Sequence, residues 1–183
     1  IGGEGEPPGG LLLAVRAARY GEAHVPRGAF FRCRSLTTLT IPAGLAEIGV
    51  AAFAGCSSLT SLTFPASVVT IGHGAFGDCS SLTNVDFSAA TDANIGRSAF
   101  MDCKRLVKLT LPAALSRIDE GTFSRCSALV ELTLPTTLTN IGRNAFARCT
   151  SLAELTLPAT LTSIGNYALS GCSALTSLAF PAS

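Results

Sequence analysis

Hydrophobic side chains recur along the chain in blocks of about 23 residues. In each block a phenylalanine, or once a leucine, stands three residues before a cysteine, and a leucine stands three residues after it. The successive cysteines are 23, 23, 24, 23, 23 and 23 residues apart, at Cys33, Cys56, Cys79, Cys103, Cys126, Cys149 and Cys172. Such self-similarity is typical of stacked repeats, which bury their apolar faces against their neighbours. The pattern predicts a solenoid of about seven repeats over residues 25–183.

Each block contains a short alternating segment that predicts a β-strand. Between Leu59 and Phe64 the pattern is Leu-x-x-Leu-x-Phe, whose last two apolar residues lie on one face of a strand. A proline follows in six of seven blocks and ends the strand, because it has no N–H group. An Ile-Gly step comes next, at which glycine indicates a sharp turn or a close backbone approach. The spacing of the final Ala-Phe-x-x-Cys segment predicts one short helical turn.

Three places depart from the repeat. Residues 1–24 lack it, and we expect a flexible lead over Ile1–Gly10 and a capping strand over Leu11–Val15. At the other end the chain stops after a predicted strand without a polar closing unit, so we expect a truncated C-terminus. The 24-residue interval contains "FSAATDANIG" and has lost its proline. It predicts either a harmless loop or a local bend and contact point around Asp92.

The string "LTLPTTLTNIGRNAFARC", from Leu132 to Cys149, resembles the BspA-like subclass of leucine-rich repeats, and the resemblance covers about residues 25–183. It implies an α/β fold, a right-handed leucine-rich-repeat solenoid with a parallel β-sheet on one face and short helical turns and extended segments on the other. The residue after the strand departs from the usual Asn or Cys of leucine-rich repeats, being Gly44, Ser67, Ala90, Ala114, Thr137 or Thr160. No asparagine ladder is therefore expected.

Charge and composition narrow the classes of partner. The formal net charge is +1, and the chain has no Trp and only two Tyr. It therefore lacks the attraction and the stacking surface of a nucleic-acid-binding protein. No window approaches the roughly 18 consecutive apolar residues of a membrane-spanning helix. We expect neither a nucleic-acid partner nor a membrane span in this stretch.

The cysteine column could have one of three chemical roles, namely metal binding, nucleophilic catalysis or disulfide formation, or it could be an inert part of the core. A metal needs ligands that converge on one point, whereas these cysteines follow the length of the rod. A nucleophile needs a nearby base, but His24 and His73 do not follow the repeat, and His73 is expected to be solvated. Neighbouring cysteines about 5 Å apart could satisfy disulfide spacing. A buried ladder of reduced thiols is the simplest interpretation. We therefore expect no catalytic residue, no metal and no cofactor, and we expect that the protein is not an enzyme.

Surface positions are free to differ between repeats, and they define two candidate binding regions. The sheet face consists of the outward strand residues Thr38, Thr40, Ser61, Thr63, Asn84, Asp86, Lys108, Thr110, Glu131, Thr133, Glu154 and Thr156. The basic edge lies beside the cysteine column and consists of Arg32, Arg34, Lys104, Arg105, Arg125 and Arg148. Because solenoids present extended faces to partners, we expect proteins to dock on the sheet face and more weakly on the basic edge.

These observations predict a non-catalytic protein-interaction or scaffold module, or a structural subunit of a larger assembly. The alternative, implied by bacterial members of the family, is a cell-surface adhesin that binds host or matrix proteins. An odd number of evenly spaced cysteines does not resemble a secreted disulfide framework. That spacing favours a reducing intracellular compartment, with the cell surface as the alternative.

Overall fold

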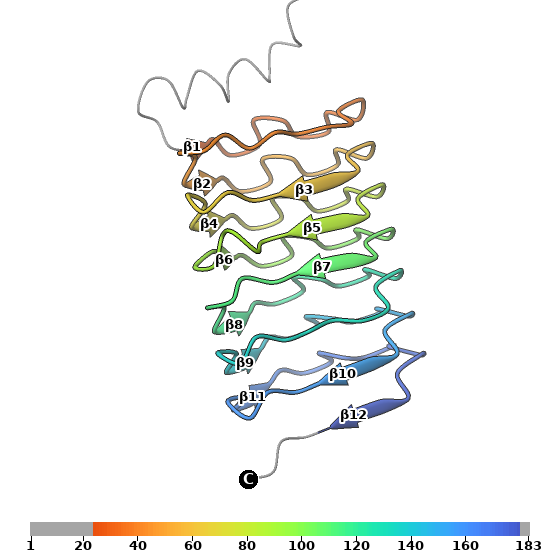
Figure 1. The fold of residues 1–183 in the computed structure, drawn as a ribbon. Coiled ribbons are helices and arrows are strands. Elements are labelled where there is room, and N and C mark those ends of the chain that lie inside the picture. The colour runs from red at the N-terminus through yellow and green to blue at the C-terminus, as the bar shows by residue number, and fades with distance from the viewer. Residues whose placement is uncertain (1–23, 180–183) are drawn as a thin grey trace, which may run out of the picture.

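A computed structural model describes residues 24–179. Over these residues the chain winds through about seven turns of a parallel β-solenoid, stacked in sequence order (Figure 1). The repeat pattern therefore predicted the architecture correctly. The expected lead over Ile1–Gly10, the capping strand over Leu11–Val15 and the last residues of the chain lie outside the described residues.

Two strips of short strands run along the solenoid. The first strip carries the sheet face and contains β3 (Ser61–Thr63), β5 (Asn84–Asp86), β7 (Lys108–Thr110), β10 (Glu154–Thr156) and β12 (Ser177–Ala179). The second strip contains β1 (His24–Val25), β2 (Glu47–Ile48), β4 (Thr70–Ile71), β6 (Asn94–Ile95), β8 (Arg117–Ile118), β9 (Asn140–Ile141) and β11 (Ser163–Ile164). Every pairing is parallel and joins neighbouring coils, as where Leu62 lies opposite Val85.

The predicted short helical turns are wrong, because residues 24–179 contain no helix. The return segment of each coil, residues 26–33 in the first, alternates two kinds of hydrogen bond. The N–H of Phe30 bonds to Ala52 O of the next coil at 2.7 Å, whereas the N–H of Cys33 bonds locally to Phe30 O at 3.1 Å. Gly28 and Arg32 have φ angles of 62° and 57°. A right-handed helix cannot continue through such left-handed residues, so each turn ends after one step.

The same two positions are left-handed in every coil. They are occupied by Gly28, Ala51, Gly74, Ser98, Gly121, Asn144 and Tyr167, and by Arg32, Gly55, Asp78, Asp102, Arg125, Arg148 and Gly171. Because most of these residues are not glycine, this conformation could not be predicted from the residue types. The mixture of local and inter-coil bonds therefore comes from the stack rather than from local residue preference.

Columns of identical side chains fill the space between the strips and the return segments. The phenylalanine rings from Phe30 to Phe146 stack with centroids 4.8, 5.3, 5.5, 5.7 and 5.7 Å apart. Phe53, Phe76, Phe100 and Phe123 are almost completely buried, so the predicted phenylalanine core is confirmed. Stacked rings of this kind contribute both apolar burial and favourable ring contacts.

The Ile-Gly step brings neighbouring coils into close contact, as predicted. A Cβ atom added at Gly72 would lie 2.6 Å from the carbonyl carbon of Gly49, so only glycine fits without a shift of the backbone. After the 24-residue interval the register is restored, since Ile95 of β6 lies opposite Ile71 of β4. Asp92 is exposed within that interval, and its role as a contact point stays a prediction.

Candidate functional site

The sheet face is interrupted between β7 and residues 130–133. β7 pairs with β5, but no pairing joins β7 to the next coil, where Glu131 makes only an isolated bridge to Glu154. A shallow groove of about 810 Å³ lies at this break. Its lining is Val107, Lys108, Leu109, Thr110, Val130, Glu131, Leu132, Thr133, Glu154 and Thr156. Six of the twelve predicted sheet-face residues thus line one groove, which the sequence did not reveal.

Two valines line the groove at a position where four other coils carry threonine and one carries alanine. The hydroxyl of Thr60 donates to Thr37 O at 3.3 Å, and that of Thr83 donates to Thr60 O at 3.0 Å. Val107 and Val130 occupy the next two positions of this column, cannot make the bond, and are 50% and 49% exposed. The substitution interrupts the hydroxyl ladder, which resumes where Thr176 donates to Ala153 O at 3.3 Å, and it leaves apolar surface at the break.

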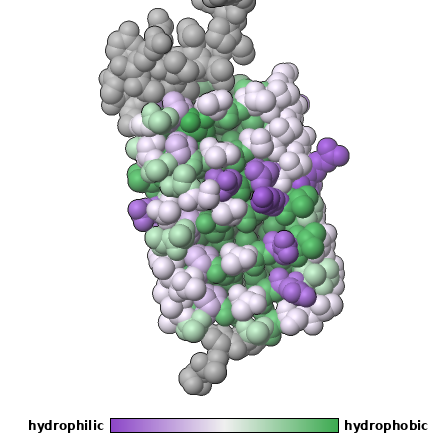
Figure 2. Space-filling model, viewed as in Figure 1, coloured by the Kyte–Doolittle hydropathy of each residue, from purple (hydrophilic) through white to green (hydrophobic). Residues whose placement is uncertain are grey.

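Charged side chains border the same groove. Glu131 and Glu154 lie opposite each other in neighbouring coils, and like charges in this arrangement repel. Neither these glutamates nor Lys108 takes part in any of the ion pairs of residues 24–179. Figure 2 shows strongly hydrophilic side chains on this side of the solenoid, next to a hydrophobic strip. The groove therefore offers both apolar surface and unpaired charge.

The second strip is interrupted as well, between β6 and β8 of neighbouring coils. Asp119 stands there in place of the repeat glycine. At Gly72 and Gly96 the N–H bonds to a carbonyl of the preceding coil at 2.7 and 2.8 Å, but Asp119 makes no such bond. At the equivalent Gly96, an added Cβ atom would lie 2.9 Å from Ile71 O of the preceding coil. A side chain at this position is therefore expected to keep the two backbones apart, and the break lies where the glycine is replaced.

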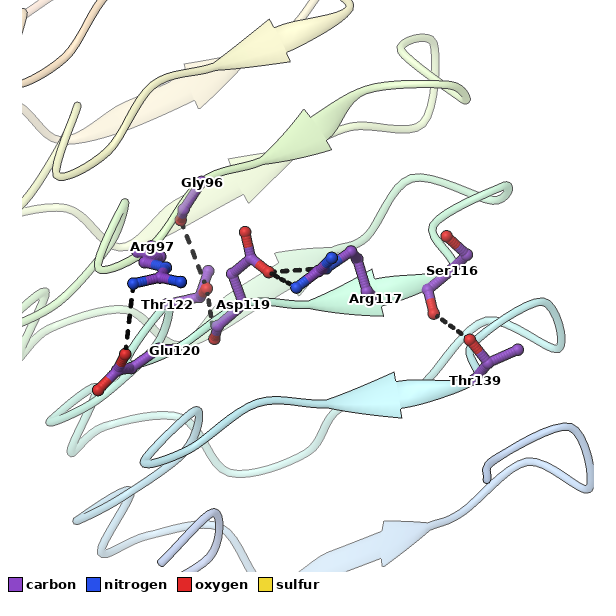
Figure 3. A network of polar contacts seen from close by, with 8 residues as sticks. All are labelled: Gly96, Arg97, Ser116, Arg117, Asp119, Glu120, Thr122 and Thr139. Atoms are coloured by element: carbon purple, nitrogen blue, oxygen red, sulfur yellow. Dashed lines mark hydrogen bonds and ion pairs between the residues drawn. The ribbon is translucent and has the colours of Figure 1, made fainter. Parts of the chain in front are cut away.

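Polar contacts gather around Asp119 (Figure 3). Arg117 Nη2 lies 2.8 Å from Asp119 Oδ1 on the same coil, and Arg97 Nη1 lies 3.7 Å from Glu120 Oε2 across the break. Thr122, fully buried where neighbouring coils have alanine, donates its hydroxyl to Asp119 O at 2.9 Å. All four ion pairs of the described residues lie between residues 97 and 125. Charge is therefore concentrated near the middle of the solenoid.

The basic edge does not form one continuous surface. Arg32 and Arg34 border a small hollow that also contains Asp78. Arg125 and Arg148 border another hollow, of about 510 Å³, together with Arg97, His73, Ser98, Met101, Glu120, Gly121, Ser124, Asn144 and Ala147. We call this second one the return-side hollow. The prediction did not anticipate that His73 and Arg97 would join the basic residues there.

Asp102 organises the basic residues beside it. Its carboxylate oxygens lie 3.6 Å from Lys104 Nζ and 3.6 Å from Arg125 Nη1, and its side chain is only 11% exposed. The Arg125 side chain remains 48% exposed, and Arg148 is exposed without an ion pair among the described residues. Both arginines can therefore contact another molecule.

The cysteine column has the chemistry of a core. Cys56 to Cys149 are buried, and Cys103 Sγ donates to Phe76 O at 3.3 Å. Burial raises the pKa of Cys56 to about 11 and the pKa of Cys79 to about 12, so these thiols stay protonated at neutral pH. Cys33 is exposed and Cys172 partly exposed, so the predicted burial is wrong at the two ends. All seven thiols are free, and residues 24–179 contain no cluster of three or more metal-ligating side chains.

The sequence matches the family described as "BspA type Leucine rich repeat region" in six copies, over residues 23–127 and 93–183. A leucine-rich repeat protein from Bacteroides ovatus is similar in structure, with a TM-score of 0.69 and 26% identity over 85% of this chain and 46% of that one. One from Eubacterium ventriosum has a TM-score of 0.62 and 33% identity over 71% of this chain and 35% of that one.

A leucine-rich repeat protein from T. pallidum has a TM-score of 0.51 and 26% identity over 85% of this chain and 58% of that one. The chain thus spans between 35% and 58% of the length of these three proteins. No curated protein matches it. Within residues 24–179 there is no helix of the length and hydrophobicity needed to cross a membrane.

Proposed function

This chain belongs to the BspA-type leucine-rich repeat family, and from that premise we propose that it is a non-catalytic protein-binding module whose sheet face holds another protein. The groove at the break in the sheet face carries this proposal. Val107 and Val130 are half-exposed there, beside charges that have no partner within the described residues. Apolar anchors flanked by charged groups are typical of the centre and rim of a protein interface.

The distribution of chemistry along the repeat supports a binding role over a catalytic one. The positions that repeat are buried phenylalanine, leucine and cysteine, and the pKa of Cys149 is raised by burial to about 12. A protonated, buried thiol is a poor nucleophile. What differs from coil to coil is the outward surface, where Lys108, Glu131 and Glu154 replace the polar residues of other coils. We therefore place function on that surface.

The test uses the double variant E131K/E154K and, as control, the single charge reversal E47K. Glu47 is also an exposed acid without an ion pair among the described residues, but it lies away from the groove. A partner isolated from the native source on the unmodified chain is purified, and its affinity for each variant is measured. We expect E131K/E154K to bind at least about tenfold more weakly, as at an interface hot spot, with an unchanged melting temperature. Equal affinity for the two variants would exclude the sheet face.

The adhesin alternative and the weaker role of the basic edge stay predictions. An adhesin that binds host or matrix proteins would use the same exposed groove, and the same pair of variants would test it against immobilised matrix protein. The alternative fails if the chain does not bind such protein while it binds an intracellular partner.

A further inference from the structure

Two columns of charged residues on different sides of the solenoid have opposite sign order. Along the sheet face, Lys108, Glu131 and Glu154 give the order positive, negative, negative. Along the return side, Asp102, Arg125 and Arg148 give the order negative, positive, positive. In each coil the sheet-face residue comes six positions after the return-side residue. Glu131 and Glu154 are therefore complementary in charge to Arg125 and Arg148. The Asp102 side chain is only 11% exposed and already lies beside Lys104 and Arg125, so the match rests on these two pairs.

The two columns also have the same spacing, because both repeat once per coil. Hydrogen bonds from Asp102 N to Ser124 O at 2.9 Å and from Arg125 N to Ala147 O at 2.7 Å hold the return-side column in register. The bridge between Glu131 and Glu154 does the same for these two residues of the sheet face. A neighbour with a parallel axis, displaced sideways and not along the axis, would bring both glutamates opposite both arginines.

From this match we infer that the protein held by the sheet face is a second copy of this chain, which docks its return-side hollow on the sheet-face groove. The inference rests on the proposed function and names its partner. Glu131 and Glu154 of one copy face Arg125 and Arg148 of the next.

The two surfaces can be used simultaneously. The residues that line the sheet-face groove and those that line the return-side hollow have no member in common. Figure 1 shows that the chain passes along the strands β5, β7 and β10 in front and returns behind them. Contact between two different patches related by translation does not close on itself. The expected assembly is therefore an open row of solenoids and not a closed dimer.

Apolar contacts add to the charge match. Val107 and Val130 project from the groove beside the charged column, and the return-side hollow includes Met101 and Ala147 in its lining. Exposed ion pairs contribute little binding energy each, so the contact depends on burying the valines as well. A net charge of +1 leaves little long-range repulsion between copies. We expect weak association that salt disrupts.

The test measures the oligomeric state of the 183-residue chain by sedimentation at several protein and salt concentrations. We expect species larger than a monomer that grow with protein concentration and dissociate as the Debye length falls to about 10 Å near 0.1 M salt. E131K/E154K and R125E/R148E should each reduce the association constant at least about tenfold, since each makes the two surfaces alike in charge. E47K reverses a charge outside both surfaces, so it is the control and should associate like the unmodified chain.

Mixing the two charge-reversed variants gives the decisive result. The lysines of E131K/E154K complement the glutamates of R125E/R148E, so the equimolar mixture should associate although neither variant does alone. Because Arg125 contacts Asp102, a second pair of variants, E154K and R148E, repeats the exchange without changing that contact. Both pairs are used only after circular dichroism shows a native fold.

Each outcome decides the inference. A monomer at every concentration in low salt, variants that associate like the unmodified chain, or a mixture that does not recover association would each overturn it. If the chain is monomeric but the sheet-face variant still loses an isolated partner, self-association is excluded and the proposed function stands. If neither effect is found, both are wrong.

Discussion

The coils on either side of residue 103 differ in how they are joined to their neighbours. Before it, β1, β2, β4 and β6 form one continuous strip, and β3 pairs with β5 in the other. The coil of residues 104–126 pairs backward only through β7 and forward only through β8. On its return segment, however, hydrogen bonds to both neighbours persist, as from Phe100 N to Thr122 O and from Phe123 N to Ala145 O at 2.9 Å each.

The comparison shows that the stack does not depend on an unbroken sheet. The phenylalanine and cysteine columns pass through the irregular coil, with Phe100, Phe123 and Phe146 stacked at 5.7 Å in both steps. Each coil contacts its neighbours through the two strips and through the return segment. The strand pairing in one strip can therefore be interrupted while the core stays packed. The opened positions are where charge and exposed valine accumulate, so binding surface can vary without loss of the fold.

The largest expected effect is alkaline unfolding, which tests whether the thiol column is continuous through both regions. Burial raises the pKa of Cys79 and Cys149 from the usual 9.0 to about 12. The thiol is neutral when protonated, so its contribution is fully present below pH 9 and is lost as the pH rises towards 12. We expect cooperative loss of circular dichroism within that window, together with thiolate absorbance.

Replacing Cys79 and Cys149 by alanine serves as the control for other groups that titrate at high pH. This variant is expected to be less stable at neutral pH, since two buried side chains become smaller, but its stability should fall less steeply above pH 9. An equally steep fall would mean that the thiols are not what limits the folded state in alkali.

The next largest effect compares the core of the two regions directly. Phe76→Ala lies in the regular part and Phe123→Ala in the irregular coil, and both rings are fully buried. Each is expected to lower the free energy of unfolding by about 3–5 kcal/mol, as for other buried phenylalanines. Denaturant unfolding measures both, with Phe31→Ala, which is 52% exposed, as control. A much smaller cost at Phe123 would show that the irregular coil is loosely packed.

The sequence predicted the core far better than the surface geometry. The spacing of Phe, Cys and Leu indicated which side chains are buried, because the pattern repeats in every coil. Equivalent side chains of stacked coils lie in the same column of the interior. The prediction of helical turns was wrong because Arg32 and Asp78 adopt left-handed conformations, which their residue types do not predict. The groove was missed because it depends on a missing pairing between coils, which no single repeat encodes.

A smaller effect is expected at the glycine step. At Gly72 an added Cβ would lie 2.6 Å from Gly49 C and 2.7 Å from Val50 N. Gly72→Ala should therefore lower the free energy of unfolding by about 1–3 kcal/mol, the usual cost of overpacking. At Gly77 the nearest atom is 3.5 Å away, an ordinary contact. Gly77→Ala should therefore raise the free energy of unfolding by about 0.4–1 kcal/mol, by restricting the unfolded chain. Opposite signs in thermal unfolding would establish that close backbone approach is specific to the Ile-Gly step.

The smallest effect on stability, and the sharpest test of the comparison, comes from Asp119→Gly. The change removes the exposed contact with Arg117 at 2.8 Å, which costs about 0–1 kcal/mol. It also lets the backbone approach β6, where a new hydrogen bond to Ile95 O would contribute about 0.5–1.5 kcal/mol. Because these terms oppose each other, the free energy of unfolding should change little. Amide hydrogen exchange should nevertheless slow at residues 117–119, as the second strip closes.

Arg117→Gln removes the same ion pair without restoring glycine, so it should leave exchange fast. Equal exchange in both variants would mean that Asp119 does not cause the break between β6 and β8.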